Sequence, residues 1–217
     1  MKKILFITAA ILAVAACCRK PQSIRNGDLV FVGIPADYSL SDSLSEAIAE
    51  ATSPGELNII HAAIANVDAD GVWIIDATIR HGVDRHPLDT FLTDFTLKDG
   101  SLPEFIVMRL KDTTGVSASV NRAKAFTGLK YNMAFVPCDT ALYCTELVRD
   151  SYISPKGEYI FPEAPMNFCA PDGTMPVYWE QLFDILGMPV PQGVPGTNPR
   201  AMMEDKSLRR INNVKLK

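Results

Sequence analysis

The clearest hydrophobic pattern along the chain is a pair of apolar segments on either side of a short polar turn. The segments read "NIIHAAIANV" and "GVWIIDATI", and they flank Asp68-Ala69-Asp70-Gly71. Asp and Gly are the residues that a tight hairpin turn requires. We therefore predict an antiparallel hairpin over residues 58–79, and further strands over residues 27–32 and 104–110, which have a similar apolar composition.

Apolar residues at helical spacing indicate several helices between and after these strands. Ser43 and Glu46 have the spacing of a capping box, followed by a helical pattern to residue 51. Further helices are predicted over residues 87–95, 120–127, 144–152 and 179–186. The helix over residues 87–95 has Pro87 in its first turn. Residues 189–199 are expected to be extended or to form turns. The mixture predicts an α+β fold with a mostly antiparallel sheet.

The N-terminus resembles a secretory leader. Two Lys precede an uncharged apolar run over residues 4–16, which is shorter than the roughly 20 residues that span a bilayer. The run ends in Val14-Ala15-Ala16-Cys17, which resembles a bacterial lipobox and implies cleavage before Cys17 and lipidation of that residue. We therefore expect a signal peptide (1–16), a lipidated tether (17–26) and a single domain (27–217) with a Pro-rich C-terminal extension. The protein is expected to be lipid-anchored in a bacterial cell envelope.

Charge and metal-ligand spacing exclude some classes of partner. The net charge is -4, and the interspersed Lys and Arg form no basic stripe, so a nucleic-acid partner is not expected. The three His residues, at positions 61, 81 and 86, and the five Cys residues lack the spacing of a metal site. We therefore expect neither a metal nor another cofactor.

Cys144 stands where an irregular segment around Pro137 gives way to the helical run "YCTELV". Unpaired backbone N–H groups at the first turn of a helix favour a thiolate, so Cys144 is a candidate nucleophile. The alternative is a small buried apolar residue. A disulfide from Cys138 to Cys144 or to Cys169 also remains open, because exported proteins can form disulfides.

A Cys nucleophile needs a base, and the base needs a partner that orients it. His61 lies in the first strand of the predicted hairpin and Asp76 in the second. A two-residue loop at Ala69-Asp70 makes His61 and Asp76 diagonal neighbours on one face of the hairpin. A loop with an odd number of residues would put them on opposite faces unless a bulge corrected it.

Taken in order, six segments resemble the YiiX-like, circularly permuted branch of the NlpC-type papain-like cysteine hydrolases. They are "GDLVF", "IIHAAI", "WIIDAT", "GVDRHPLDTFL", "GLKYNMAF" and "YCTELV". The resemblance spans roughly residues 27–200 and implies a permuted papain-like fold with a partial barrel. It also implies that Cys144 is the nucleophile, His61 the general base and acid, and Asp76 the orienting group. Many members have Glu at this third position.

Other polar residues near these motifs have structural alternatives. Tyr131 and Tyr143 could supply a hydroxyl near the oxyanion or line the pocket, or they could pack in the core. Glu146 is expected to be a structural hydrogen-bond acceptor, because it points to another side of the helix from Cys144. His81 and His86 border a predicted loop and helix start, and we expect them to be exposed to solvent.

The implied reaction is hydrolysis of an amide or ester through a thioester intermediate. Anchoring beneath the cell wall makes a murein peptide the first expected substrate, with an acyl-amide or other lipid as the alternative. A third possibility is a binding lipoprotein of the same fold without catalytic activity.

Overall fold

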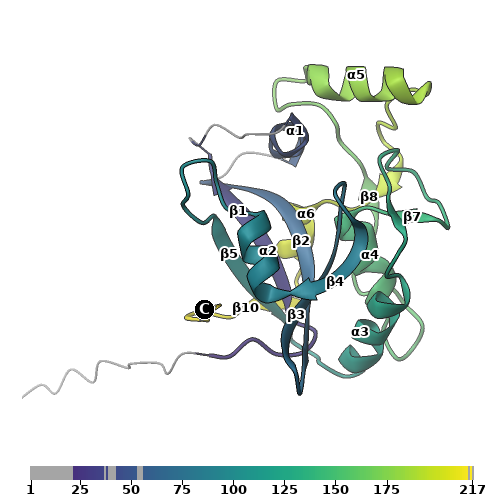
Figure 1. The fold of residues 1–217 in the computed structure, drawn as a ribbon. Coiled ribbons are helices and arrows are strands. Elements are labelled where there is room, and N and C mark those ends of the chain that lie inside the picture. The colour runs from purple at the N-terminus through teal and green to yellow at the C-terminus, as the bar shows by residue number, and fades with distance from the viewer. Residues whose placement is uncertain (1–21, 37, 39–42, 53–55, 215, 217) are drawn as a thin grey trace, which may run out of the picture.

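The computed structural model describes residues 22–36, 38, 43–52, 56–214 and 216, and a six-stranded antiparallel sheet lies at its centre (Figure 1). In spatial order the strands are β10 (Leu208–Arg210), β5 (Glu104–Leu110), β1 (Leu29–Pro35), β2 (Leu57–Asp68), β3 (Gly71–Thr78) and β4 (Gly82–Pro87). The predicted strands correspond to β1, β2, β3 and β5. The α+β class with a mostly antiparallel sheet is confirmed.

The predicted hairpin is β2–β3, and its register follows the turn residues. Asp68 pairs with Gly71, so Ala69 and Asp70 form a two-residue loop as expected. On the other side of β2, Val32 pairs with His61 and Gly33 with Ile59, so Ile60 is an extra residue without a partner on β1. This bulge lies next to His61, and bulges re-aim the side chains beside them.

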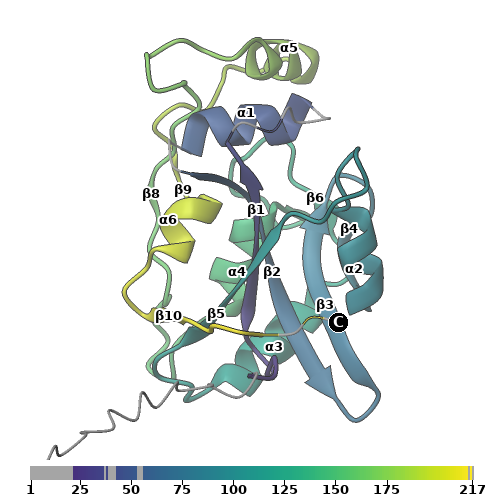
Figure 2. The same cartoon turned by 90° about the vertical axis from the view of Figure 1, so that its left-hand side faces the viewer.

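The two faces of the sheet bury different helices. Alternate residues of β1 and β2 pack on α3 (Val116–Ala125) and α4 (Cys144–Ser151) on one face. Residues of opposite parity pack on α2 (Leu88–Asp94), which covers the other face (Figures 1 and 2). This arrangement follows from the period of two in a strand, which sends neighbouring side chains to opposite faces.

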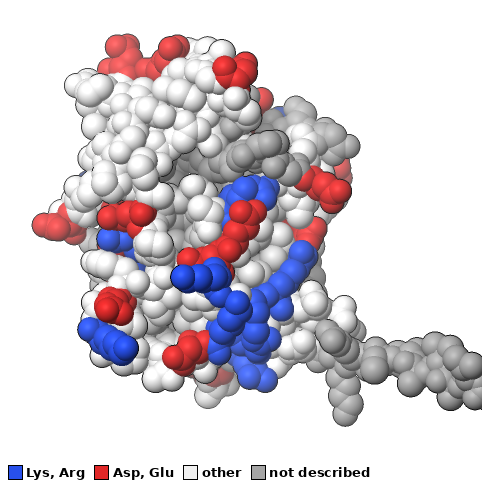
Figure 3. Space-filling model, turned by 180° about the vertical axis from the view of Figure 1, so that it is seen from behind, with Lys and Arg blue, Asp and Glu red and all other residues white. Residues whose placement is uncertain are grey.

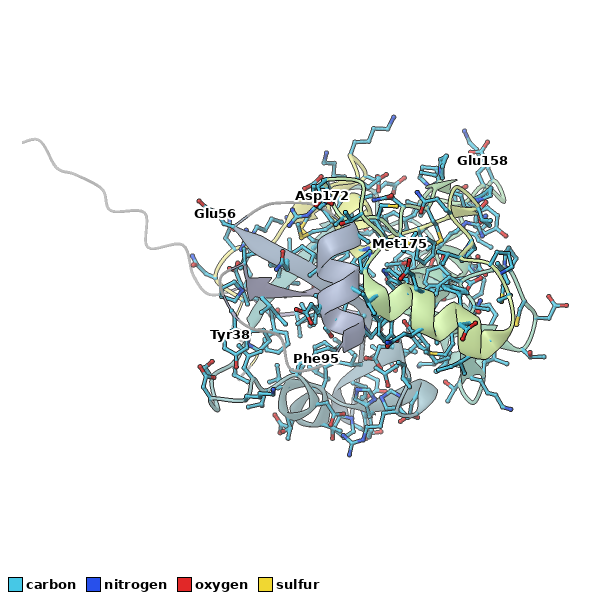
Figure 4. All side chains as sticks on the ribbon, turned by 90° about the horizontal axis from the view of Figure 1, so that it is seen from above. Tyr38, Glu56, Phe95, Glu158, Asp172 and Met175 are labelled. Atoms are coloured by element: carbon cyan, nitrogen blue, oxygen red, sulfur yellow. The ribbon has the colours of Figure 1, made fainter. Side chains whose placement is uncertain are left out.

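An aromatic layer closes one end of the sheet. Helices α1 (Ser43–Thr52) and α5 (Val177–Leu186) lie side by side over that end (Figure 4). The layer consists of Trp179 and Phe183 of α5 together with Phe135, Tyr143 and Phe168, and several of its rings pack in edge-to-face geometry. Because Tyr143 immediately precedes α4, this layer packs against the start of the helix that carries Cys144.

The segment after residue 189 is part of the fold rather than an appendage. β9 (Pro195–Gly196) pairs with β8 (Ala164–Pro165), α6 (Pro199–Met203) packs on β2, and β10 forms one edge of the sheet. The expectation of extended chain and turns over residues 189–199 is confirmed as far as Asn198, where α6 follows. The sequence pattern predicts none of α6, β10 and β4. β4 reads "GVDRHP", and its polar residues at an edge position hide the apolar alternation of a strand. The sequence pattern predicts Pro87 in the first turn of the following helix, but Pro87 is the last residue of β4 and the N-cap residue of α2.

Residues 22–26, assigned above to the tether, lie against the domain. Ile24 is buried, Ser23 accepts a hydrogen bond from Arg109, and Gln22 forms a bridge with Val214. The expected signal peptide, Cys17 and Cys18 lie outside the described residues.

Surface charge is mixed on the face seen from behind, where basic side chains gather in the lower half and acidic ones occur throughout (Figure 3). Within the described part of the chain, no helix has the length and apolar character needed to cross a bilayer.

Candidate active site

Cys144 is the first residue of α4, as predicted. The short strand β7 (Ala141–Leu142) leads into it, and Tyr143 is the extended N-cap residue. Cys144 is buried, with 4% of its surface exposed. The thiol therefore lies beside the unpaired backbone N–H groups of the first helical turn, where a negative charge is stabilised.

Glu146 holds the start of this helix. Its Oε2 accepts hydrogen bonds from the Tyr143 backbone N–H at 3.2 Å and from the Asn132 side chain at 3.1 Å. Burial raises the pKa of Glu146 to about 7, although these two hydrogen bonds favour the charged form. The prediction that Glu146 is a structural acceptor is confirmed. Asn132, which also donates to the Val136 carbonyl, gave no signal in the sequence.

The hairpin brings His61 and Asp76 together. Nε2 of His61 lies 2.8 Å from Oδ2 of Asp76, and both residues are buried. The ring of Phe95 lies 4.8 Å from the His61 ring and that of Phe91 lies 6.3 Å away, measured between centroids. The predicted placement of His61 and Asp76 on one face is therefore observed, and aromatic packing restricts the imidazole.

His61 also interacts with Cys144. Burial by itself lowers the pKa of His61, but hydrogen bonds with Asp76 and Cys144 outweigh it and raise the pKa to about 10. Because Nε2 faces Asp76, Nδ1 is the ring nitrogen left to exchange a proton with the Cys144 sulfur. The three residues thus form a chain of acid, imidazole and thiol.

Two adjoining hollows give access to these residues. The larger has a volume of about 280 Å³ and is lined by His61 and Asp76, and the smaller has a volume of about 40 Å³ and is lined by Cys144. Ile48 and Tyr131 line both hollows. A substrate lying across Ile48 and Tyr131 would therefore reach both the imidazole and the thiol.

The two tyrosines singled out from the sequence occupy different positions. Tyr131 lies between the hollows, and burial raises its pKa, so its hydroxyl stays protonated. Tyr143 lines only the smaller hollow, and its hydroxyl oxygen accepts a hydrogen bond from the Thr197 backbone N–H at 3.1 Å. Tyr131 is the better placed of the two to reach a bound substrate.

The expectation that His81 and His86 are exposed to solvent is wrong. His86 is buried, and the His81 side chain is 23% exposed. Both rings turn towards Asp76. The pairing of β4 with β3 sets Asp84 opposite Asp76, so His86 lies diagonally across from Asp76 on the same face, and His81 stands in the turn just before β4. His residues that are scattered along the chain are therefore clustered in space.

The remaining cysteines do not form the disulfides left open by the sequence. Cys138, Cys144 and Cys169 are all free thiols. Cys138 is exposed, and its sulfur lies 3.5 Å from the Thr140 hydroxyl. Cys144 is thus available as a thiol.

Comparison with known proteins agrees with this arrangement. A family model for permuted papain-like amidase enzymes (YaeF/YiiX, C92 family) matches residues 23–212. The crystal structure of metalloprotein YiiX from Escherichia coli O157:H7 is similar in fold, with a TM-score of 0.66 and 19% identity over 88% of this chain and 97% of that chain. The search of curated proteins returned no match. The expected permuted papain-like fold is confirmed, and the chain belongs to the permuted papain-like amidase family, a family of cysteine hydrolases.

Proposed function

We propose that this protein hydrolyses amide bonds through a thioester on Cys144. The observation that carries the proposal is the chain of Asp76, His61 and Cys144 at the N-terminus of α4. A thiol, a base within reach and a carboxylate orienting the base are the three components that nucleophilic acyl transfer requires.

The reaction follows from the positions of these groups. The Cys144 thiolate attacks the substrate carbonyl, and its carbon–sulfur bond forms as the carbonyl oxygen becomes negatively charged. Backbone N–H groups at the start of α4 and the Tyr131 hydroxyl are the donors proposed to stabilise that oxygen. His61 then protonates the leaving amine as the carbon–nitrogen bond breaks. In the second half, His61 takes a proton from water, and the resulting hydroxide attacks the thioester carbonyl. The carbon–sulfur bond then breaks, which releases the acid and restores the Cys144 thiolate beside the protonated His61.

Asp76 holds the imidazole in the required orientation and stabilises its charged form. The high pKa of His61 is consistent with an imidazolium beside a thiolate. This thiol chemistry itself requires no metal ion, although the solved relative is described as a metalloprotein.

We propose a murein peptide as the first substrate class, on the basis of the expected lipid anchor at Cys17 and a location in the bacterial cell envelope. An acyl-amide lipid is the second candidate. Its support is the lining of the hollow at Cys144, which has no charged side chain and includes Ile48, Phe135, Met166, Phe168 and Trp179. Such a lining suits an apolar group, and a volume of about 40 Å³ limits that group to the part of an acyl chain next to the carbonyl.

The test is to incubate the detergent-solubilised full-length protein with murein fragments and with N-acyl amide lipids, and to identify products by mass spectrometry. The Cys144→Ala variant should form no product and no acyl-enzyme adduct. The matched control is Cys138→Ala, which removes an exposed thiol and should retain full activity. Product formation by Cys144→Ala would refute the thioester mechanism. A lack of products and of thioester with every substrate would favour the non-catalytic binding lipoprotein.

A further inference from the structure

We infer that Asp76, His81 and His86 form a binding site for a divalent transition-metal ion of the zinc type. This site is distinct from the thiol of Cys144 and goes beyond the proposed function. One ligand atom from each residue lies within 4.8 Å of the other two, in the part of the chain that the structure describes. Two imidazoles and one carboxylate are a ligand set that favours zinc and similar ions over calcium or magnesium.

The donor atoms are close enough to share one ion after rotation of the side chains. Nε2 of His81 lies 3.9 Å from Oδ1 of Asp76, and Nε2 of His86 lies 3.8 Å from the same oxygen. Ligands at about 2.0–2.1 Å from a tetrahedral ion stand roughly 3.4 Å apart. To complete the site, each histidine nitrogen would move about half an ångström towards Oδ1 of Asp76. The two histidine nitrogens lie within 4.8 Å of each other and would approach by up to about 1.4 Å, which side-chain rotation can supply.

Two of these donor atoms lack hydrogen-bond partners among the described residues. They are Oδ1 of Asp76 and Nε2 of His86, and both atoms are buried. Asp76 as a whole is 0% exposed and His86 is 7% exposed. Burying a polar atom without a partner is destabilising, so two such atoms directed at one point indicate a ligand between them.

The other nitrogen of each imidazole faces an oxygen. Nδ1 of His81 lies 3.0 Å from the Gly82 carbonyl, and Nδ1 of His86 lies 3.7 Å from the Asp84 carboxylate. A histidine that binds a metal through one nitrogen usually donates its other N–H to a carbonyl or carboxylate, which fixes the tautomer. His81 therefore has the hydrogen bond typical of a metal-binding histidine, and His86 has a carboxylate near the same nitrogen.

Gly82 positions His81. Its φ is +70°, and a Cβ at this residue would lie 2.2 Å from the Leu129 carbonyl oxygen. Only glycine therefore fits the turn that places the His81 ring over Asp76.

The site is open on one side and separate from the thiol. Asp76, His81 and His86 all line the larger hollow, which leaves room for water or a substrate atom as a further ligand. Cys144 lines only the smaller hollow. Within Asp76 the two oxygens have different partners, because Oδ2 contacts His61 and Oδ1 faces the two other histidines.

The test uses the full-length protein, stripped with a chelator and titrated with Zn²⁺ in competition with a chromogenic indicator. Co²⁺ serves as a spectroscopic probe, because a thiolate ligand would add a sulfur-to-metal charge-transfer band. We expect one ion per chain, no charge-transfer band, and the same affinity in Cys144→Ala. His81→Gln and His86→Gln should each weaken binding at least tenfold.

Three results would overturn the inference: no stoichiometric binding by the wild type, unchanged affinity in both His variants, or loss of binding in Cys144→Ala. Loss of binding in Cys144→Ala would indicate that the Cys144 thiol is a ligand of the ion. Thermal melting of each metal-free variant checks folding, and His81→Gln keeps the test valid if His86→Gln misfolds, since His81 is the more exposed residue. Added Zn²⁺ should raise the melting temperature of the wild type but not that of His81→Gln.

Discussion

Nε2 of His61 lies 2.8 Å from Oδ2 of Asp76, while Oδ1 of the same carboxylate faces His81 and His86. One buried side chain thus links the proposed nucleophile system to the proposed metal site. The link depends on the two-residue loop at Ala69-Asp70, because a register shift of one residue would send Asp76 to the other face of the sheet.

Replacing Asp76 by Asn tests the orienting role. The amide keeps the size of the side chain but cannot stabilise an imidazolium, so we expect a folded protein whose turnover falls by roughly 10²- to 10⁴-fold. Turnover of an amide substrate and the circular dichroism spectrum measure the two effects. Unchanged turnover would show that Asp76 does not act on His61 during the reaction.

Removing the base tests the pairing of His61 with Cys144. An ordinary thiol is only a few per cent thiolate at pH 7, so loss of the base in His61→Ala should slow alkylation of Cys144. A more basic thiol is also a stronger nucleophile, which offsets part of this loss. The expected net effect is a rate about tenfold lower. Peptide mapping of iodoacetamide labelling at pH 7, in the presence of a chelator, gives the rate at each cysteine. The exposed Cys138 is the internal control and should label at the same rate in both proteins. Equal Cys144 rates in wild type and variant would contradict the pairing.

Glu146 should make folding stability depend on pH. Its pKa rises from 4.5 to about 7 in the folded protein, mainly through burial. Between these values the folded state holds a proton that the unfolded chain has released, so stability falls as the pH rises through this window. Glu146→Gln keeps an acceptor for the Tyr143 N–H and removes this loss. The unfolding free energy of the variant should equal that of the wild type near pH 4 and exceed it by about 2 kcal/mol above pH 7.5. This difference is smaller than the pKa shift alone would give, because solvent partly screens the carboxylate.

Urea unfolding of both proteins at pH 4.5, 6 and 8 measures this difference. A stability difference that does not change with pH would mean that Glu146 is not the group responsible.

The buried pair of Arg109 and Asp28 should be essential for stability. Nε and Nη2 of Arg109 lie 2.6 and 2.7 Å from the two carboxylate oxygens, and the side chains are 4% and 1% exposed. Arg109→Met leaves a buried carboxylate without its partner, so we expect a loss of about 3–5 kcal/mol in unfolding free energy. The double variant Asp28→Leu/Arg109→Met should recover much of that loss.

The matched control for this prediction is Arg80→Met. Arg80 pairs with Asp94 at 2.6 Å, but its side chain is 77% exposed. Denaturant unfolding should show a change of less than about 1 kcal/mol for this variant. Similar losses in Arg80→Met and Arg109→Met would refute the argument from burial.

The anchoring prediction rests on Val14-Ala15-Ala16-Cys17. Protein expressed with its native leader should partition with membranes and carry a lipid mass on Cys17, while Cys17→Ser should be released or left unprocessed. Mass spectrometry of the mature N-terminus checks this outcome. An unmodified soluble chain that starts at another residue would remove the lipoprotein assignment and leave the proposed chemistry intact.

The sequence by itself determined the features that depend on neighbouring residues. The hairpin over β2 and β3 follows from apolar segments around an Asp-Gly turn, and its two-residue loop is enough to bring His61 to Asp76. The position of Cys144 at the start of α4 likewise follows from the change between an irregular segment and a helical pattern. These relationships are local, so the spacing of residue types carries the information.

The tertiary structure alone decided what depends on pairing between distant or weakly patterned segments. β4 has the polar sequence of an edge strand, and its register against β3 turns His86 towards Asp76, while the turn at Gly82 places His81 there. The place of Tyr131 between the two hollows depends on the packing of its short strand β6 (Lys130–Tyr131) against β3 and β4, which no local pattern specifies. Which side chains converge across strands is set by the hydrogen-bond register, and register is a property of the assembled sheet rather than of either strand.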